Sequence, residues 1–180
     1  ALKERTRGYM QQYDPAFVTE YMRRQCPLEA GQVIAQADRL MGQTFTFEDR
    51  WDMEPCAVPY TLKEMIWDYS PNQDPEWIFM LNRHEYLHKL LLAYRLTGKQ
   101  AYIENWITSN PILPEGTVTT RSIDTGIRCM SWQFLLIHLI GEGLMGQQEA
   151  ERILDSMRSQ FSYMRNGYIG KYTLSNWGLL

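Results

Sequence analysis

Two Asp-Pro pairs, at 14–15 and 74–75, most constrain what this 180-residue chain can fold into. Aspartate is a preferred N-cap and proline is favoured at the first helical position, so each pair predicts the start of a helix. Apolar residues recur with helical spacing after each pair, and again after Pro27. The sequence therefore predicts a chain dominated by helices.

The predicted helices come in pairs joined by turns. The helix that starts at Asp74-Pro75 is expected to run without interruption to Gly98, and a return helix around 102–107 follows it. A second pair is predicted after 122, with a turn between Gly141 and Gly146. Successive hairpins of similar length suggest a helical array or toroid, so we expect an all-α fold.

Two stretches depart from this helical pattern. Between 43 and 73 prolines recur and the helical period is lost, which predicts a loop-rich insertion with a short pair of strands. At the end, Ser175 and Asn176 resemble a helix N-cap, but no second turn follows. We therefore expect one domain over 1–180 that is cut where a further helix starts.

The net charge and the lengths of the apolar stretches limit the classes of partner. A formal net charge of −3 gives no bulk attraction to nucleic acid, so no nucleic-acid partner is expected. No stretch reaches the roughly 20 apolar residues of a membrane helix, so no membrane partner is expected either. The sequence has no cofactor motif, and we expect no cofactor.

The stretch 84–88 reads H-E-x-x-H, which on one helix face is the spacing of a zinc peptidase. His84 and His88 would bind the metal, and Glu85 would act as the general base. A third protein ligand is missing from the sequence after His88, and Arg83 would repel the ion, so the prediction is that there is no metal site. The alternatives are a core helix that happens to carry two histidines, or a ligand groove lined by Arg83 and His84.

Two longer stretches favour the groove. They read DPEWIFMLNRHEYLHKLLLAYRLTGKQAYIENW at 74–106 and TRSIDTGIRCMSWQF at 120–134. Their order of tryptophan, L-N-R-H, T-G, and later an acidic residue, G-I-R and tryptophan resembles the N-terminal helical domain of the heparinase II/III family of polysaccharide lyases. The shared pattern covers roughly 36–140 and the SNWG at 175–178.

The resemblance implies an incomplete (α/α) toroid, of which residues 1–180 are the N-terminal part, truncated before its end. It also implies a lyase that cleaves an acidic, uronate-containing polysaccharide, heparan sulfate or a similar glycosaminoglycan, by β-elimination. It implies Asn176 as the catalytic residue that neutralises the uronate carboxylate, although Asn176 also suits a helix cap. Many relatives have histidine at the next position, where this chain has Trp177, and this leaves open a different uronate or a lower activity. The family's catalytic tyrosine, and its β-sheet domains with the catalytic histidine, would lie beyond Leu180. The fragment is therefore predicted to be inactive alone.

Arginines are the expected substrate-binding groups, because a guanidinium pairs with carboxylate or sulfate in a bidentate manner. Arg83, Arg121 and Arg128 are predicted in the groove, with surface ion pairs as the alternative. Asn82 and Asp124 are expected to bind sugar hydroxyls or to orient the arginines, and Asp124 also suits a helix cap. His84 is expected to line the groove and to bind the acidic oligosaccharide together with Arg83, Arg128 and Asn176.

The tryptophans divide into two groups. Trp77, Trp106 and Trp132 fall on helix stripes and are predicted to pack in the core. Trp51 and Trp177 lie off these stripes and are predicted as platforms for a sugar ring. His138, in an apolar run, is predicted to be a core histidine.

Three functional hypotheses follow. The first is one wall of the substrate cleft of a periplasmic or secreted uronan lyase. The second is a carbohydrate-binding or helical scaffold module without catalysis, and the third is a zinc hydrolase.

Overall fold

The chain is mainly helical in the computed structural model, which describes residues 2–10, 12, 14–49, 55–109 and 121–166. The helices are α1 (Leu2–Met10), α2 (Pro15–Gln25), α3 (Pro27–Met41), α4 (Pro75–Arg83), α5 (His88–Thr97), α6 (Ala101–Ser109), α7 (Ser122–Gly141) and α8 (Gln147–Asn166). A single 3₁₀ turn, η1 (Glu85–Leu87), separates α4 from α5. The predicted all-α class is confirmed, and α1 is a helix that the sequence pattern had not indicated.

Both Asp-Pro pairs start helices as predicted. Asp14 accepts a hydrogen bond from the backbone N–H of Phe17 at 2.9 Å, and Asp74 accepts one from Glu76 at 2.9 Å. Each proline occupies the first turn, where the missing N–H removes no helical bond. These local rules therefore set the starts of α2 and α4.

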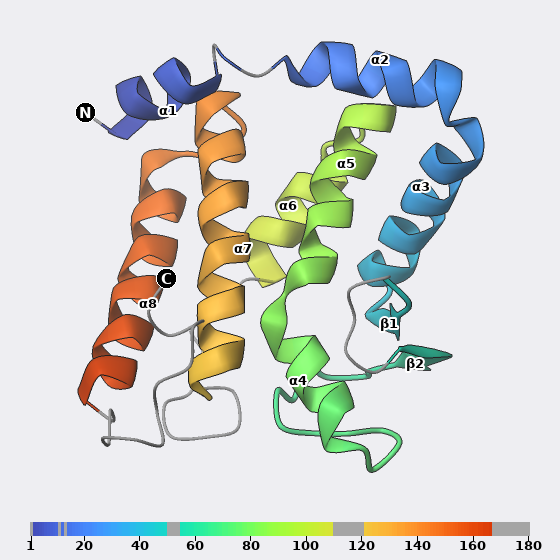
Figure 1. Ribbon diagram of the computed structural model, residues 1–180, viewed down its shortest axis with the longest axis vertical. Coiled ribbons are helices and arrows are strands. Elements are labelled where there is room, and N and C mark those ends of the chain that lie inside the picture. The colour runs from blue at the N-terminus through green and yellow to red at the C-terminus, as the bar shows by residue number, and fades with distance from the viewer. Residues whose placement is uncertain (1, 11, 13, 50–54, 110–120, 167–180) are drawn as a thin grey trace.

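The helices pack as an array of neighbours (Figure 1). Helix α5 packs against α3 and α6, and α7 packs against α4 and α8, while α1 and α2 lie across one end of the upright helices. Among the described helices, none combines the length and the hydropathy that a bilayer-spanning segment requires.

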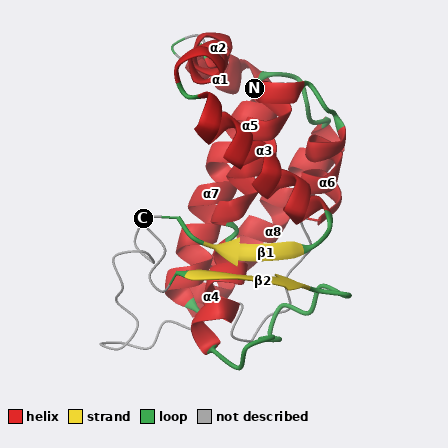
Figure 2. Ribbon diagram, turned by 90° about the vertical axis from the view of Figure 1, so that its right-hand side faces the viewer, coloured by secondary structure: helices red, strands yellow, loops and turns green. Residues whose placement is uncertain are grey.

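The insertion contains the expected strand pair, β1 (Thr44–Phe47) and β2 (Cys56–Thr61), which run antiparallel (Figure 2). Thr44 pairs with Thr61, and the register becomes irregular after Phe45. Because side chains alternate along a strand, Phe45 and Phe47 both face inward and are buried against Trp77. The insertion thus contributes to the core and covers α4.

The core confirms the predictions for the tryptophans on helix stripes. Trp77, Trp106 and Trp132 are each at most 2% exposed. His138 is also buried, with Arg95 Nη2 at 2.9 Å from its Nδ1. Burying an aromatic side chain removes a large apolar area from water, so these residues anchor α4, α6 and α7 to one another.

The prediction of one uninterrupted helix from 75 to 97 is wrong. Helix α4 ends at Arg83, and His84 adopts a left-handed conformation with φ of 59° and ψ of 18°. The chain then makes the single turn η1 before α5 begins at His88. Neither glycine nor proline marks this break, so the periodic apolar pattern continued across it without a signal.

Candidate functional site

The break at His84 is held by the contacts of its imidazole. A left-handed conformation costs a residue other than glycine about 1–2 kcal/mol, and histidine is among the residues enriched there. The buried ring lies 5.0 Å from the ring of Trp67 and 5.5 Å from that of Trp132, between centroids. Trp132 Nε1 also donates a hydrogen bond to His84 Nδ1 at 3.1 Å. Strained backbone of this kind concentrates at functional sites, which makes the break a place to look for one.

The three residues at the break bond to one face of α7. The backbone oxygen of Asn82, the guanidinium of Arg83 and the imidazole of His84 have partners spaced four residues apart, and these are Arg128, Asp124 and Trp132 respectively. Residues four apart lie on the same helix face. The L-N-R-H segment and the later segment with an acidic residue, G-I-R and tryptophan therefore interlock in space.

Arg128 compensates for the interruption of the helix. Its Nη1 donates to the backbone oxygen of Asn82 at 2.6 Å, at the end of α4 where carbonyls lack helical partners. Nε and Nη2 donate to Gln160 Oε1 at 2.8 and 2.7 Å, and Nη2 also donates to Thr125 Oγ1 at 3.2 Å. Burial lowers the pKa of this guanidinium to about 10. Arg128 remains a cation at neutral pH.

Asp124 lies between two other arginines. Arg83 Nε donates to Asp124 Oδ1 at 2.8 Å, and Arg121 Nε lies 3.2 Å from Oδ2. Burial raises the pKa of Asp124, and the neighbouring arginines oppose that shift. Arg121 is the accessible member of this cluster, with 39% of its side chain exposed and its guanidinium 3.5 Å from the ring centre of Phe79.

The structure places five of the predicted binding residues in one buried cluster: Asn82, Arg83, His84, Asp124 and Arg128. Surface ion pairs were the sequence alternative for Arg83 and Arg128, and that alternative is wrong because both side chains are buried. Direct binding of substrate by these side chains stays a prediction. Their observed contacts fix the backbone and the orientation of the imidazole at the break.

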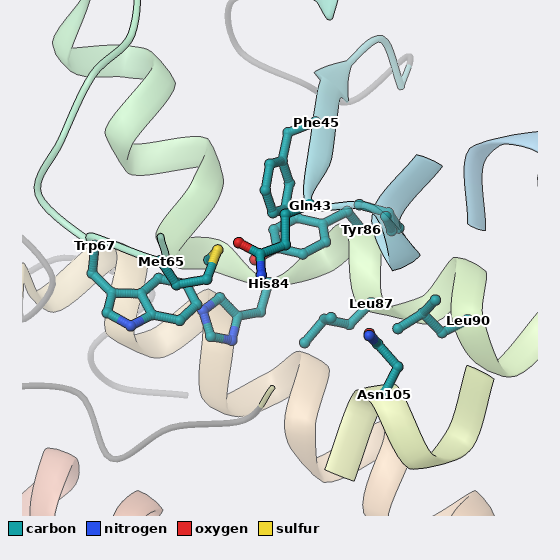
Figure 3. Close-up of a pocket in the computed structure, with 10 residues that line it drawn as sticks. Gln43, Phe45, Met65, Trp67, His84, Tyr86, Leu87, Leu90 and Asn105 are labelled. Carbon is teal, nitrogen blue, oxygen red and sulfur yellow. The ribbon is translucent and has the colours of Figure 1, made fainter. Parts of the chain in front are cut away.

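A pocket opens beside this cluster, with a volume of about 370 Å³ (Figure 3). The pocket is lined by residues from α3, the turn before β1, β1, the segment after β2, the break, α5 and α6. They are Leu40, Gln43, Phe45, Met65, Trp67, His84, Tyr86, Leu87, Leu90 and Asn105. Figure 3 shows Gln43 reaching toward His84, with Met65 and Trp67 on one side of the imidazole. No carboxylate, lysine or arginine is among the described lining residues.

Two buried polar atoms in this pocket have no hydrogen-bond partner among the described residues: His84 Nε2 and Gln43 Oε1. Because Trp132 donates to Nδ1 of His84, the neutral ring carries its proton on Nε2. Burial lowers the pKa of His84 well below its usual value, and Arg128 lowers it further. The pocket thus offers one N–H donor and one oxygen acceptor without net charge.

The geometry that the zinc alternative requires is absent. That alternative needs both imidazoles on one continuous helix face, whereas the chain breaks at His84 before α5 starts at His88. His88 Nε2 instead lies 3.4 Å from the backbone oxygen of Ser131. Across the described part of the chain, no three histidine, cysteine, aspartate or glutamate side chains gather into a possible metal site.

The remaining predicted residues fall outside the described residues. These are Asn176, Trp177 and Trp51. Their predicted roles, as carboxylate neutraliser and as sugar platforms, stay predictions.

Sequence reasoning missed most of the pocket. Gln43 and Trp67 lie in the insertion, and Asn105 lies on α6. Gln43 has a positive φ of 53° two residues after the end of α3, a position that favours a polar residue but does not indicate a ligand. The signal that could have found the site is L-N-R-H itself, whose histidine points into the pocket.

Comparison with known proteins identifies the relationship. Residues 6–136 match the family model described as Heparinase II/III N-terminus. A heparin-sulfate lyase of Bacteroides thetaiotaomicron (strain ATCC 29148 / DSM 2079 / JCM 5827 / CCUG 10774 / NCTC 10582 / VPI-5482 / E50) is 31% identical over 98 residues, which cover 48% of this chain and 14% of that protein. The chain therefore matches only a small part of the length of this relative. No solved structure matches the chain.

Proposed function

Because the chain belongs to the heparinase II/III family through its N-terminal region, we propose that it forms one wall of the substrate cleft of a lyase. The substrate class is a uronate-containing glycosaminoglycan similar to heparan sulfate, and the reaction is β-elimination. The proposal includes a periplasmic or secreted location, and β-sheet domains of the same polypeptide that complete the cleft. On this proposal, the 180 residues alone bind but do not cleave.

The observation that carries the proposal is the interlock between the break at His84 and α7. The family match includes both segments. Their contacts bury charged side chains and hold a strained backbone beside one small pocket. A helix needed only for packing gains nothing from such a break, since an uninterrupted helix would satisfy the same backbone groups.

The charges around Asp124 suit an acidic substrate. Arg83 and Arg121 share the carboxylate of Asp124, whereas Arg128 donates hydrogen bonds to Gln160, Thr125 and the backbone oxygen of Asn82, which are neutral. Positive charge therefore exceeds negative charge among these four side chains, although the whole chain is acidic. A local surplus of this sign raises the concentration of a polyanion nearby, and Arg121 is exposed enough to contact a carboxylate or sulfate.

The chemistry requires one further group on this side of the cleft. Removing the proton at C5 of a uronate becomes feasible when its carboxylate is neutralised and the developing enolate charge is stabilised. Asn176 is our candidate for that role, by its match to the family motif S-N-W-G. The base and acid would come from the β-sheet domains and their neighbourhood.

The test compares this chain with a longer version that carries β-sheet domains. We expect the longer version to release unsaturated uronate from heparan sulfate, measured by its ultraviolet absorbance, and the 180-residue chain to release none. Asn176→Ala should abolish release by the longer version. Asn166→Ala, an exposed asparagine at the end of α8, is the matched control and should leave the rate unchanged.

The outcomes separate the hypotheses. Binding of heparan sulfate by both versions without cleavage would refute the lyase and favour the carbohydrate-binding module. Cleavage that survives Asn176→Ala would leave the lyase standing and remove Asn176 from its mechanism.

A further inference from the structure

The pocket beside the break has a polarity that suits a part of the substrate other than the uronate. Its described lining carries no formal charge, and His84 is held in its neutral form. A uronate carboxylate or an ammonium group placed there would lose its hydration without finding a countercharge, which is costly. The occupant must therefore be neutral.

The two unpartnered atoms define the hydrogen bonds that the occupant makes. His84 Nε2 presents an N–H donor, and Gln43 Oε1 presents an acceptor, both buried and both in the pocket wall. A buried polar atom without a partner costs about 1–3 kcal/mol, so a ligand that satisfies both atoms recovers that free energy. A secondary amide matches the pair, because it carries one C=O and one N–H.

The rest of the wall suits a small apolar group on that amide. Phe45, Met65 and Leu87 supply apolar surface, and the Trp67 ring lies beside His84 in Figure 3. Aromatic faces stack on the apolar face of sugar rings, and a methyl group fits against methionine and phenylalanine. A volume of about 370 Å³ is at the lower end for small-molecule pockets, which suits one substituted ring.

We propose that this pocket binds the acetamido group of a 2-acetamido sugar, with His84 Nε2 donating to its carbonyl and Gln43 Oε1 accepting from its N–H. This deepens the proposed function: it rests on the lyase acting on a glycosaminoglycan, and it assigns the uncharged amino sugar to this pocket. The arginine cluster is then left to the neighbouring acidic unit. The strained conformation of His84 serves to aim its Nε2 at the carbonyl.

The test is an NMR titration of the ¹⁵N-labelled chain, which follows the side-chain amide of Gln43 and the indole N–H of Trp67. Methyl N-acetyl-glucosaminide is the probe, and methyl glucoside, with a hydroxyl in place of the acetamido group, is the reference. We expect the acetamido sugar to shift both signals and to bind about tenfold more tightly than the glucoside, the ratio expected for the two amide hydrogen bonds.

Gln43→Met removes the acceptor at similar size and should weaken the acetamido sugar about tenfold without affecting the glucoside. The matched control is Gln147→Met, the same change at an exposed site on α8, which should leave both affinities unchanged. Thermal unfolding of each variant checks that it is folded, and His84→Asn gives a second variant because asparagine tolerates the left-handed conformation.

Equal affinity for the two sugars, no shift with the acetamido sugar, or an unchanged affinity in folded Gln43→Met would each overturn the assignment. These results are independent of cleavage. If the acetamido sugar binds and the longer version is inactive, the proposed lyase function is refuted and the assignment of the pocket stands. If the longer version cleaves and the pocket shows no acetamido selectivity, the lyase function stands and the assignment of the pocket is refuted.

Discussion

Replacing Asp124 by asparagine tests whether the buried arginine cluster holds the break in place. The change keeps the size of the side chain and removes its charge. Asp124 is 0% exposed, with Arg83 Nε at 2.8 Å from Oδ1 and Arg121 Nε at 3.2 Å from Oδ2. After the substitution, the buried guanidinium of Arg83 loses the carboxylate that compensates for its burial.

The expected cost follows from that burial. Removing one partner of a buried ion pair destabilises a protein by about 3–5 kcal/mol, because the other charge stays buried without compensation. Asparagine retains one oxygen acceptor for Arg83, so we expect the lower end, about 3 kcal/mol. At a slope of about 2 kcal/mol per molar of urea, this loss lowers the unfolding midpoint by about 1.5 M.

Urea unfolding followed by tryptophan fluorescence measures the effect, because Trp132 and Trp77 report on α7 and α4. The matched control is Asp155→Asn on α8, where Asp155 also pairs with an arginine three residues away, Arg158, but both side chains are about 70% exposed. An exposed pair contributes about 0–1 kcal/mol, so this variant should unfold almost like the parent.

A loss below about 1 kcal/mol in Asp124→Asn would refute the reasoning. It would mean that burial, which raises the pKa of Asp124, keeps this carboxyl protonated at neutral pH. The cluster would then contain no ion pair to break.

Two further predictions concern stability. Burial lowers the pKa of His84, and of His88 to a smaller extent. Below the unfolded pKa of about 6.5, the unfolded chain therefore binds more protons than the folded chain. The contribution of these neutral histidines to the free energy of unfolding is fully present above that pH and is lost as the pH falls below it. Unfolding at pH 7.5 and 5.5 should differ by about 1 kcal/mol from His84, and His84→Asn should reduce this difference; a flat profile in the parent protein would contradict the lowered pKa. Gly98 has a φ of 75° at the end of α5, so Gly98→Ala should lower the free energy of unfolding by about 1 kcal/mol. Gly31→Ala inside α3, where an added Cβ meets open space, should raise it by about 0.5–1 kcal/mol. Unfolding of both variants measures these changes, and two changes of equal sign would refute the conformational argument.

The helix starts were readable from the chain because they depend on neighbours in sequence. An aspartate side chain reaches the N–H groups of the next turn, and proline fixes its own φ, so Asp14 and Asp74 act wherever the helix packs. Periodic apolar residues predicted the buried Trp77 and Trp132 for a similar reason, since a helix presents one stripe to the core.

Only part of the candidate site could be predicted from the sequence. The L-N-R-H segment and the segment containing Asp124 and Arg128 were identified from their residues, but their direct contacts were not, because Arg83 and Asp124 lie 41 positions apart in the chain. The pocket residue Gln43 was missed, because its position depends on how the strand pair folds over α4.

What the sequence by itself determined was the helical class, the helix starts and the residues of the two interlocking motifs. Tertiary structure alone decided that the helix breaks at His84. An unbroken helix is the local preference of that stretch, and the left-handed turn becomes favourable once Trp132 donates to the imidazole and Arg128 satisfies the carbonyl of Asn82. Both partners come from α7. The hydrogen bonds that offset the cost of the left-handed conformation therefore form only after the helices have packed.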